Sequence, residues 1–235
     1  SHMDPAEAGG YAKNSAHLVS RWLYDNIDDD DTRKQWFIGP KYDLDAMDQE
    51  FIDKYDPTED PAKRTKQMAL YYWEQEQNAL YNRDNTQGFT YSANSYVQLK
   101  FRRKGPGVWT NDMLYMMASE MYLIRAEASI RKTATDYNAA VSALNSVVQP
   151  KLETYDANTF PKANVRTFDG YANDATFAAR NLLDEVYFQR RPELWGEGHR
   201  HFDLRRPKMN LQRNYPETNH LSAPYGLFYA DHKRE

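Results

Sequence analysis

Apolar residues recur at helical spacing through residues 111–149, and this pattern constrains the fold more than any other feature. The first stretch carries one apolar stripe, formed by Leu114, Met117, Met121, Ile124 and Ala128. The second stretch carries another, formed by Ala140, Leu144 and Val147, with Ala139 and Ala143 beside it. Steps of three and four residues place each set on one face of an α-helix. The break at residues 132–135 and the small alanines, which let helices approach closely, predict an antiparallel helical hairpin over residues 112–149.

The rest of the chain predicts a mainly α fold with long loops and few short strands. A third helix is expected to begin near Asp174 or Thr176, and Pro192 should kink or restart it because proline lacks the backbone donor. The apolar residues expected on this helix are Phe177, Leu183, Val186 and Leu194. Alternation of polar and apolar residues predicts one short strand over residues 96–101.

The composition excludes several classes of function. The chain has 235 residues and a net charge of −4, which argues against a general nucleic-acid binder, because such a protein needs a basic face. It has no cysteine, which excludes a disulfide scaffold, a thiolate zinc site and a cysteine nucleophile. The acidic run at residues 28–31 indicates a solvated loop rather than a calcium site, because a calcium loop alternates its ligands with other residues.

The chain is expected to consist of a short leader and one large region. Ser1-His2-Met3 resembles the scar of a cleaved tag, and the residues that follow are small and polar. We therefore predict that residues 1–12 are a tag scar and flexible leader. Residues 13–235 are predicted to form a single region that contains the hairpin.

Two segments, in this order, resemble the C-terminal half of the SusD/RagB family. The first runs from Ala118 to Ala128 (ASEMYLIRAEA) and continues through Ala140 to Asn145. The second covers residues 189–206 and reads QRRPELWGEGHRHFDLRR. Asp31-Thr32-Arg33 resembles a further family motif upstream, whereas Gln189 stands where the family usually has Glu.

The resemblance implies a SusD-like fold of helix pairs similar to tetratricopeptide repeats. It also implies a surface lipoprotein of Bacteroidetes that is not an enzyme and needs no cofactor or metal. Such a protein captures an oligo- or polysaccharide and delivers it to a SusC-like TonB-dependent transporter. Its implied location is the extracellular face of the outer membrane, with a lipid anchor in the full-length protein.

Two other functions are compatible with the residues. The first is a helical-repeat scaffold that contacts only protein. The second is a glycoside hydrolase that uses two of Glu193, Glu197 and Asp203. Each of these carboxylates has arginine neighbours, which lower a carboxyl pKa and make it a poor general acid, so we expect structural ion pairs instead. The same argument applies to Glu127, which should pair with Arg131 four residues along its helix.

The aromatic residues indicate the ligand site. Sugars present apolar C–H faces, so a sugar site needs flat rings beside polar groups. The family resemblance directs attention to the segments before the hairpin, where we predict ligand contacts at Trp36, Tyr42, Trp73 and Tyr81. At least two of these rings are expected to be partly exposed on one face.

Overall fold

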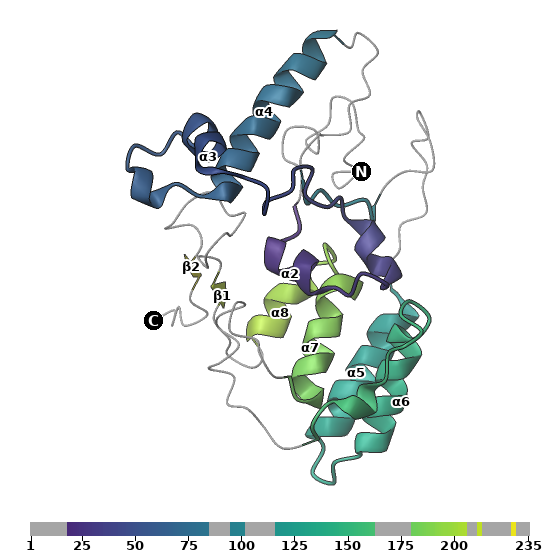
Figure 1. The fold of residues 1–235 in the computed structure, drawn as a ribbon. Coiled ribbons are helices and arrows are strands. Elements are labelled where there is room, and N and C mark those ends of the chain that lie inside the picture. Colours follow the sequence, from purple (N-terminus) through teal and green to yellow (C-terminus); the bar gives the residue numbers. More distant parts are fainter. Residues whose placement is uncertain are drawn as a thin grey trace, which may run out of the picture. The chain divides into compact units, whose positions relative to one another are not determined.

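A computed structural model describes residues 18–84, 95–101, 116–162, 180–205, 211–212 and 227–228. Contacts divide the chain into two compact units. Unit 1 comprises Ser1–Asp25, Lys34–Asp112 and Pro216–Leu221, and unit 2 comprises Asn26–Arg33, Met113–Tyr215 and Ser222–Glu235. The described residues form seven α-helices, three short 3₁₀ helices and two strands of two residues each (Figure 1). The predicted mainly α fold is therefore confirmed, whereas the single region over residues 13–235 stays a prediction.

Unit 2 is built on the predicted helical hairpin. Helix α5 (Ala118–Arg131) and helix α6 (Tyr137–Val148) are joined by a short turn and pack against each other, and α7 (Leu182–Glu193) packs on both. Helix α6 begins at Asp136, whose side chain accepts a hydrogen bond from the Ala139 amide. This cap satisfies a backbone donor that the helix itself leaves unpaired.

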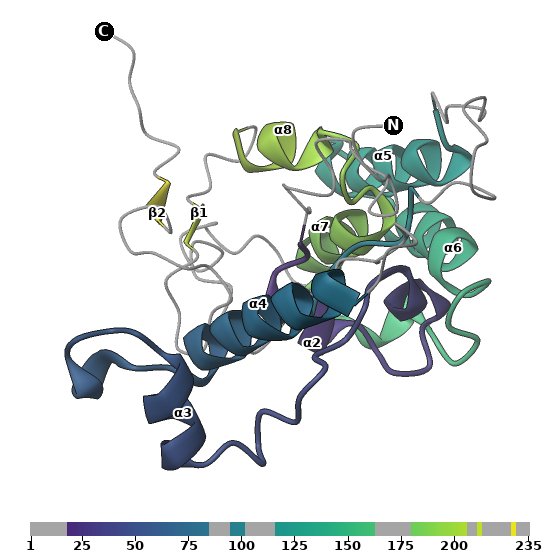
Figure 2. The same cartoon turned by 90° about the horizontal axis from the view of Figure 1, so that it is seen from above.

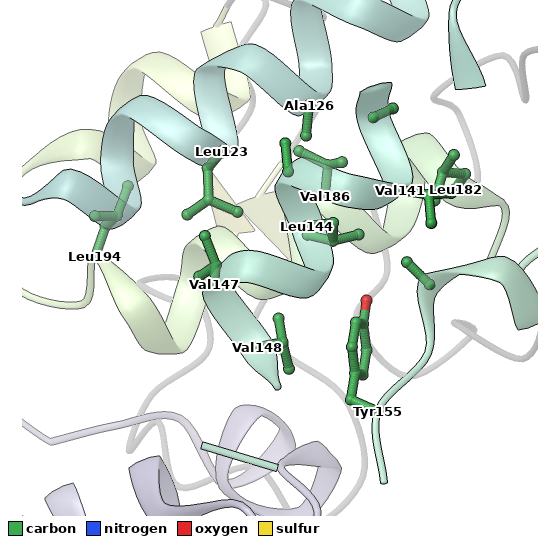
Figure 3. Close-up of a cluster of buried hydrophobic side chains, with 13 residues drawn as sticks. Leu123, Ala126, Val141, Leu144, Val147, Val148, Tyr155, Leu182, Val186 and Leu194 are labelled. Atoms are coloured by element: carbon green, nitrogen blue, oxygen red, sulfur yellow. The ribbon is translucent and has the colours of Figure 1, made fainter. Parts of the chain in front are cut away.

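The core of unit 2 lies between these three helices. Figure 3 shows Leu123 of α5 and Val147 of α6 pointing toward each other, with Val186 of α7 close to Leu144. The predicted stripe of α6 is confirmed, because Ala140, Leu144 and Val147 are buried, as is Ala143. Burial of side chains of this size supplies the main driving force for the packing.

The predicted apolar stripe of α5 is wrong for Met121, Ile124 and Ala128, which are exposed, whereas Met117 packs against the core and Leu114 lies outside the described residues. Met121 and Ile124 are 42% and 44% exposed, whereas Leu123, Ala126 and Glu127 are buried. The buried face is therefore rotated from the predicted one. Glu127 can lie on the buried face because its carboxylate has hydrogen-bond partners there. Its carboxylate accepts hydrogen bonds from the Arg131 guanidinium at 2.8 Å and the Tyr187 hydroxyl at 2.6 Å. The predicted pairing of Glu127 with Arg131 is confirmed.

The later elements of unit 2 follow α7. Helix α7 begins after Asn181, at a capping box with Asp184, and ends one residue past Pro192, so it starts later than predicted. Helix α8 (His199–Arg205) follows α7 in the chain. The 3₁₀ helix η3 (Ala157–Thr159) lies earlier, between α6 and α7. Strands β1 (Leu211–Gln212) and β2 (Leu227–Phe228) pair antiparallel, with Leu211 opposite Phe228. Residues 163–179, including Phe177, lie outside the described residues.

Unit 1 contains a helical part and a small ladder of extended backbone. Helix α3 (Gln49–Tyr55) lies beside α4 (Lys66–Asp84) in both views (Figure 1 and Figure 2), and the 3₁₀ helix η2 (Pro61–Lys63) connects them. Helix α2 (Arg21–Asn26) and the 3₁₀ helix η1 (Thr32–Trp36) come earlier in the chain, and each includes a point where the chain passes from one unit to the other. In the ladder, Val97 bridges Leu18 and Gln98 bridges Phe37, which agrees with the predicted short strand. In the described residues, no helix is long and apolar enough to cross a membrane.

Candidate functional site

Four aromatic rings of unit 1 form one contiguous cluster, which we call the aromatic cluster: Tyr42, Phe51, Tyr55 and Trp73. The Phe51 ring lies 4.6 Å from the Tyr42 ring and 4.7 Å from the Tyr55 ring, between centroids. The Trp73 ring stands edge-on to Tyr42, with the centroids 5.5 Å apart. All four side chains are half-buried. Rings at these separations support one another and leave part of each ring at the surface.

Three segments hold the aromatic cluster in place. Tyr42 comes from the loop before α3, Phe51 and Tyr55 lie one turn apart on α3, and Trp73 lies on α4. Beneath the rings, the buried side chains of Leu44, Met47 and Leu70 form a small core. The aromatic rings therefore rest on a packed base, which limits their motion and suits them to bind a ligand.

Local hydrogen bonds cap helix α3 and fix its connection to helix α4, the two helices that carry rings of the aromatic cluster. The Asp48 side chain caps α3 by accepting a hydrogen bond from the Phe51 amide at 2.8 Å. The buried Asp56 accepts from the amides of Thr58 and Thr65, and so shapes the connection between α3 and α4. The Lys66 ammonium donates to the Leu44 carbonyl at 2.6 Å, which ties α4 to the loop before α3.

The structure brings together two of the four residues predicted from the sequence. Tyr42 and Trp73 are half-buried neighbours in the aromatic cluster. Trp36 is half-buried beside the ladder, where the Lys100 ammonium lies 5.3 Å from the centre of its ring. Helix α4 passes through Tyr81, whose side chain lies outside the described residues. The roles of all four residues in ligand binding stay predictions.

Sequence reasoning missed Phe51 and Tyr55. Their spacing of four residues places them on the same face of a helix, and this was the only signal that could have found them. The four-residue spacing alone does not separate a ligand site from a core. The neighbouring rings of Tyr42 and Trp73 come from distant parts of the sequence, and only the fold brings them together.

A buried carboxylate, that of Glu74, follows Trp73 on α4. The Glu74 carboxylate accepts hydrogen bonds from the amide and the hydroxyl of Ser95, and burial raises its pKa above the ordinary value. Burial likewise lowers the pKa of Lys41, although attraction to Glu74 opposes this shift. These contacts connect α4 to the start of the ladder, so their role is structural.

Two of the three carboxylates weighed as catalytic groups, Glu193 and Asp203, form ion pairs in unit 2, whereas the expected pairing of Glu197 stays a prediction. Glu193 accepts from Arg33 at 3.4 Å and from Lys151 at 3.1 Å, and Asp203 pairs with Arg190 at 2.9 Å. Both carboxylates are buried. The prediction that Glu193 and Asp203 make ion pairs is therefore confirmed.

Arg33 is the centre of the largest of these polar networks, and sequence reasoning assigned it no role. Its side chain is fully buried. The guanidinium donates to both oxygens of Asp31, to the Gln189 side-chain oxygen at 2.6 Å and to Glu193. Gln189 in turn donates to Glu185, whose pKa is raised by burial. This network fixes Asp31 and the start of η1 onto α7.

The described residues hold no group of three His, Asp or Glu side chains that could bind a metal ion. The His199 imidazole lies 3.5 Å from the Glu120 carboxylate, a pair rather than a cluster. The clustered, half-buried aromatic rings and the ion-paired state of Glu193 and Asp203 therefore favour a ligand-binding protein over a glycoside hydrolase.

The family model confirms this class and names the family. The model of the SusD family matches residues 14–233, so the chain belongs to the SusD family. This confirms the resemblance found in the sequence. No curated protein and no solved structure matches the chain.

Membership of the family carries general properties. SusD family proteins are binding proteins of the outer-membrane surface, anchored as lipoproteins, and they do not catalyse a reaction. They bind glycans and work with a SusC partner. The prediction that the chain is not an enzyme is confirmed on this basis.

Proposed function

We propose that this protein captures an oligo- or polysaccharide on the extracellular face of the outer membrane and delivers it to a SusC-like TonB-dependent transporter. The aromatic cluster is the binding platform, and Trp36 and Tyr81 are further contacts. The full-length protein is lipid-anchored to the surface of a cell of the Bacteroidetes. Membership of the SusD family supports this proposal.

The observation that carries the proposal is the arrangement of Tyr42, Phe51 and Trp73. Three half-buried rings from three segments lie within 6.4 Å of one another, over a packed base. Such rings offer flat apolar faces to the C–H groups of a sugar, while the exposed carboxylates of Asp43 and Glu50, next to Tyr42 and Phe51 in the chain, can accept hydrogen bonds from its hydroxyls.

Affinity electrophoresis tests the proposal. The whole chain is run through native gels that contain starch, xylan, mannan or pectic galactan, and retardation reports binding. We expect Trp73→Ala to abolish the retardation, because the variant removes the largest ring of the aromatic cluster. The matched control is Tyr72→Ala, because Tyr72 is 39% exposed on the same helix and packs on Tyr71. Equal retardation of the Trp73 variant and the parent protein would refute the site.

A second observation favours a protein contact on α5. Met121, Tyr122 and Ile124 are each at least 40% exposed on this helix. Met121 and Ile124, three residues apart, are neighbours on one side of the helix, and exposed apolar side chains that lie together in this way are typical of an interaction surface. We propose that the transporter covers this surface, so Ile124→Glu should reduce co-purification of the transporter while leaving glycan retardation unchanged. Loss of both activities would contradict the separation of the two surfaces.

A further inference from the structure

The segment that builds the aromatic cluster is strongly acidic. Residues 41–76 contain ten Asp and Glu against five Lys and Arg, a net charge of −5, whereas the whole chain carries −4. Eight of the ten acidic side chains are exposed. The excess negative charge of the protein therefore lies at the surface of the segment that carries the aromatic rings.

Acidic groups and carbonyls engage the basic side chains of this segment. Three of the bases have short polar contacts: Arg64 with Asp53 at 2.9 Å, Lys63 with Asp60 at 3.1 Å, and Lys66 with the Leu44 carbonyl at 2.6 Å. The fourth, Lys41, is attracted to the buried Glu74. A negatively charged ligand would have to compete with these partners for each cation.

The fifth base, Lys54, is the cation at the aromatic cluster itself. Its ammonium lies 4.7 Å from the centre of the Tyr55 ring, an attraction that a ring face offers to a cation. It also interacts with the Tyr55 hydroxyl and is attracted to Glu76 and Glu50. Lys54 therefore lies over a ring of this chain and is attracted to two of its carboxylates.

Exposed carboxylates flank the ring-bearing residues along the chain. Asp43 follows Tyr42, Glu50 precedes Phe51, and Glu76 lies three residues after Trp73 on the same helix, which places the two on neighbouring positions of its surface. Carboxylates accept hydrogen bonds from the hydroxyl groups of an uncharged sugar. They repel carboxylate or sulfate groups within about one Debye length, roughly 10 Å at 0.1 M salt.

We infer that the aromatic cluster takes an uncharged glycan and rejects polymers that carry carboxylate or sulfate groups. This inference rests on the proposed function, because it names the substrate class of the same site. The rings supply the contact with the sugar faces, and the surrounding carboxylates supply both hydrogen-bond acceptors and the discrimination by charge.

Matched polymers that differ in charge test the inference. The probes are hydroxyethyl and carboxymethyl cellulose, dextran and dextran sulfate, and methyl-esterified and de-esterified homogalacturonan, together with starch, xylan and mannan. Retardation of the whole chain is measured at 0.1 M and 1 M NaCl, with and without Trp73→Ala. Retardation that is lost in Trp73→Ala is attributed to the aromatic cluster. We expect this part of the retardation to be strongest for an uncharged polymer and to differ little between the two salt concentrations.

The outcomes separate the inference from the proposed function. If an anionic polymer gives the strongest retardation that depends on Trp73, the inference is wrong while the proposed function stands. If no polymer gives retardation that depends on Trp73, both are wrong.

Charge neutralisation gives a second readout. The double variant Glu50→Gln with Glu76→Gln should bind the anionic member of each pair more tightly, by about threefold for each carboxylate at a separation of roughly 6 Å in water. Glu59→Gln is the matched control, because it removes an exposed carboxylate from the loop before η2. If the double variant binds the anionic polymers no better than this control does, charge does not set the specificity and the inference fails.

Discussion

Replacing Arg33 by methionine should destabilise unit 2 severely. The fully buried guanidinium donates to Asp31, Gln189 and Glu193. Methionine keeps an unbranched apolar stem in the same space but leaves those three acceptors short of a donor. Removing one partner of a buried ion pair costs about 3–5 kcal/mol, because the remaining charge stays buried without compensation.

The structure explains why the cost should fall within that range. Asp31 is 4% exposed and would keep the Arg33 amide, which donates to it at 2.9 Å, as its remaining donor. Glu193 would keep Lys151, so its loss is smaller. A cost of 3–5 kcal/mol corresponds to a fall in Tm of roughly 6–20 °C for a protein of this size. Thermal and urea unfolding of the whole chain, followed by circular dichroism, measure the change.

Arg21→Met is the matched control. Arg21 also pairs with an aspartate, at 3.1 Å from Asp25, but the two side chains are 22% and 47% exposed. An exposed pair four residues apart on a helix contributes only about 0.3–0.5 kcal/mol. If Arg33→Met were no more destabilising than Arg21→Met, the network around Arg33 would not hold Asp31 and the start of η1, and the reasoning would be refuted.

Three further predictions concern unit 2. Leu123→Ala should cost about 3–5 kcal/mol in urea unfolding because Leu123 is fully buried, whereas Ile124→Ala should cost less than about 1 kcal/mol; equal losses would contradict the assigned face of α5. Asn181→Ala should cost about 1 kcal/mol in the same assay through loss of the capping box, and an unchanged midpoint would speak against that cap. Burial raises the pKa of Glu185, so its contribution to stability is present below the ordinary value of 4.5 and is lost as the pH rises through the folded-state value. Glu185→Gln should therefore gain stability relative to the parent protein as the pH rises above 4.5, and a stability difference that is the same at every pH above 4.5 as it is below would contradict the shift.

Local signals made the second helix of the hairpin predictable. Asp136 caps α6, and the residues at helical spacing, Ala140, Leu144 and Val147, are all buried. These apolar residues lie on one face of the helix, so the face that packs in the core can be predicted from their spacing alone. The sequence resemblance to the family was equally local, because it rested on contiguous segments.

The face of α5 could not be read in the same way. Apolar residues occur around most of this helix, and spacing favoured Met121 and Ile124 over Leu123. Glu127 lies on the true core face because Tyr187, sixty residues away, donates a hydrogen bond to it. A partner so distant in the sequence leaves no local signal, and tertiary contacts decided which of two possible faces was buried.

The candidate site was predictable only in part. An excess of aromatic residues before the hairpin pointed to Tyr42 and Trp73, and the structure makes these two rings neighbours. The packing of α3 on α4 creates that contact and adds Phe51 and Tyr55. In the sequence these two residues cannot be distinguished from the core side of a short helix.

The central claim is that the aromatic cluster binds the glycan, and the indole N–H signal of Trp73 tests it most directly. The chain contains five tryptophans, so its indole region in a ¹⁵N–¹H NMR spectrum is simple, and Trp73→Phe assigns the signal. The ligand is an oligosaccharide fragment of the polymer that retards the protein most strongly. We predict that titration shifts the Trp73 signal progressively to saturation while the Trp195 signal of unit 2 stays in place. A saturating titration that moves other indole signals and leaves Trp73 unchanged would contradict the account.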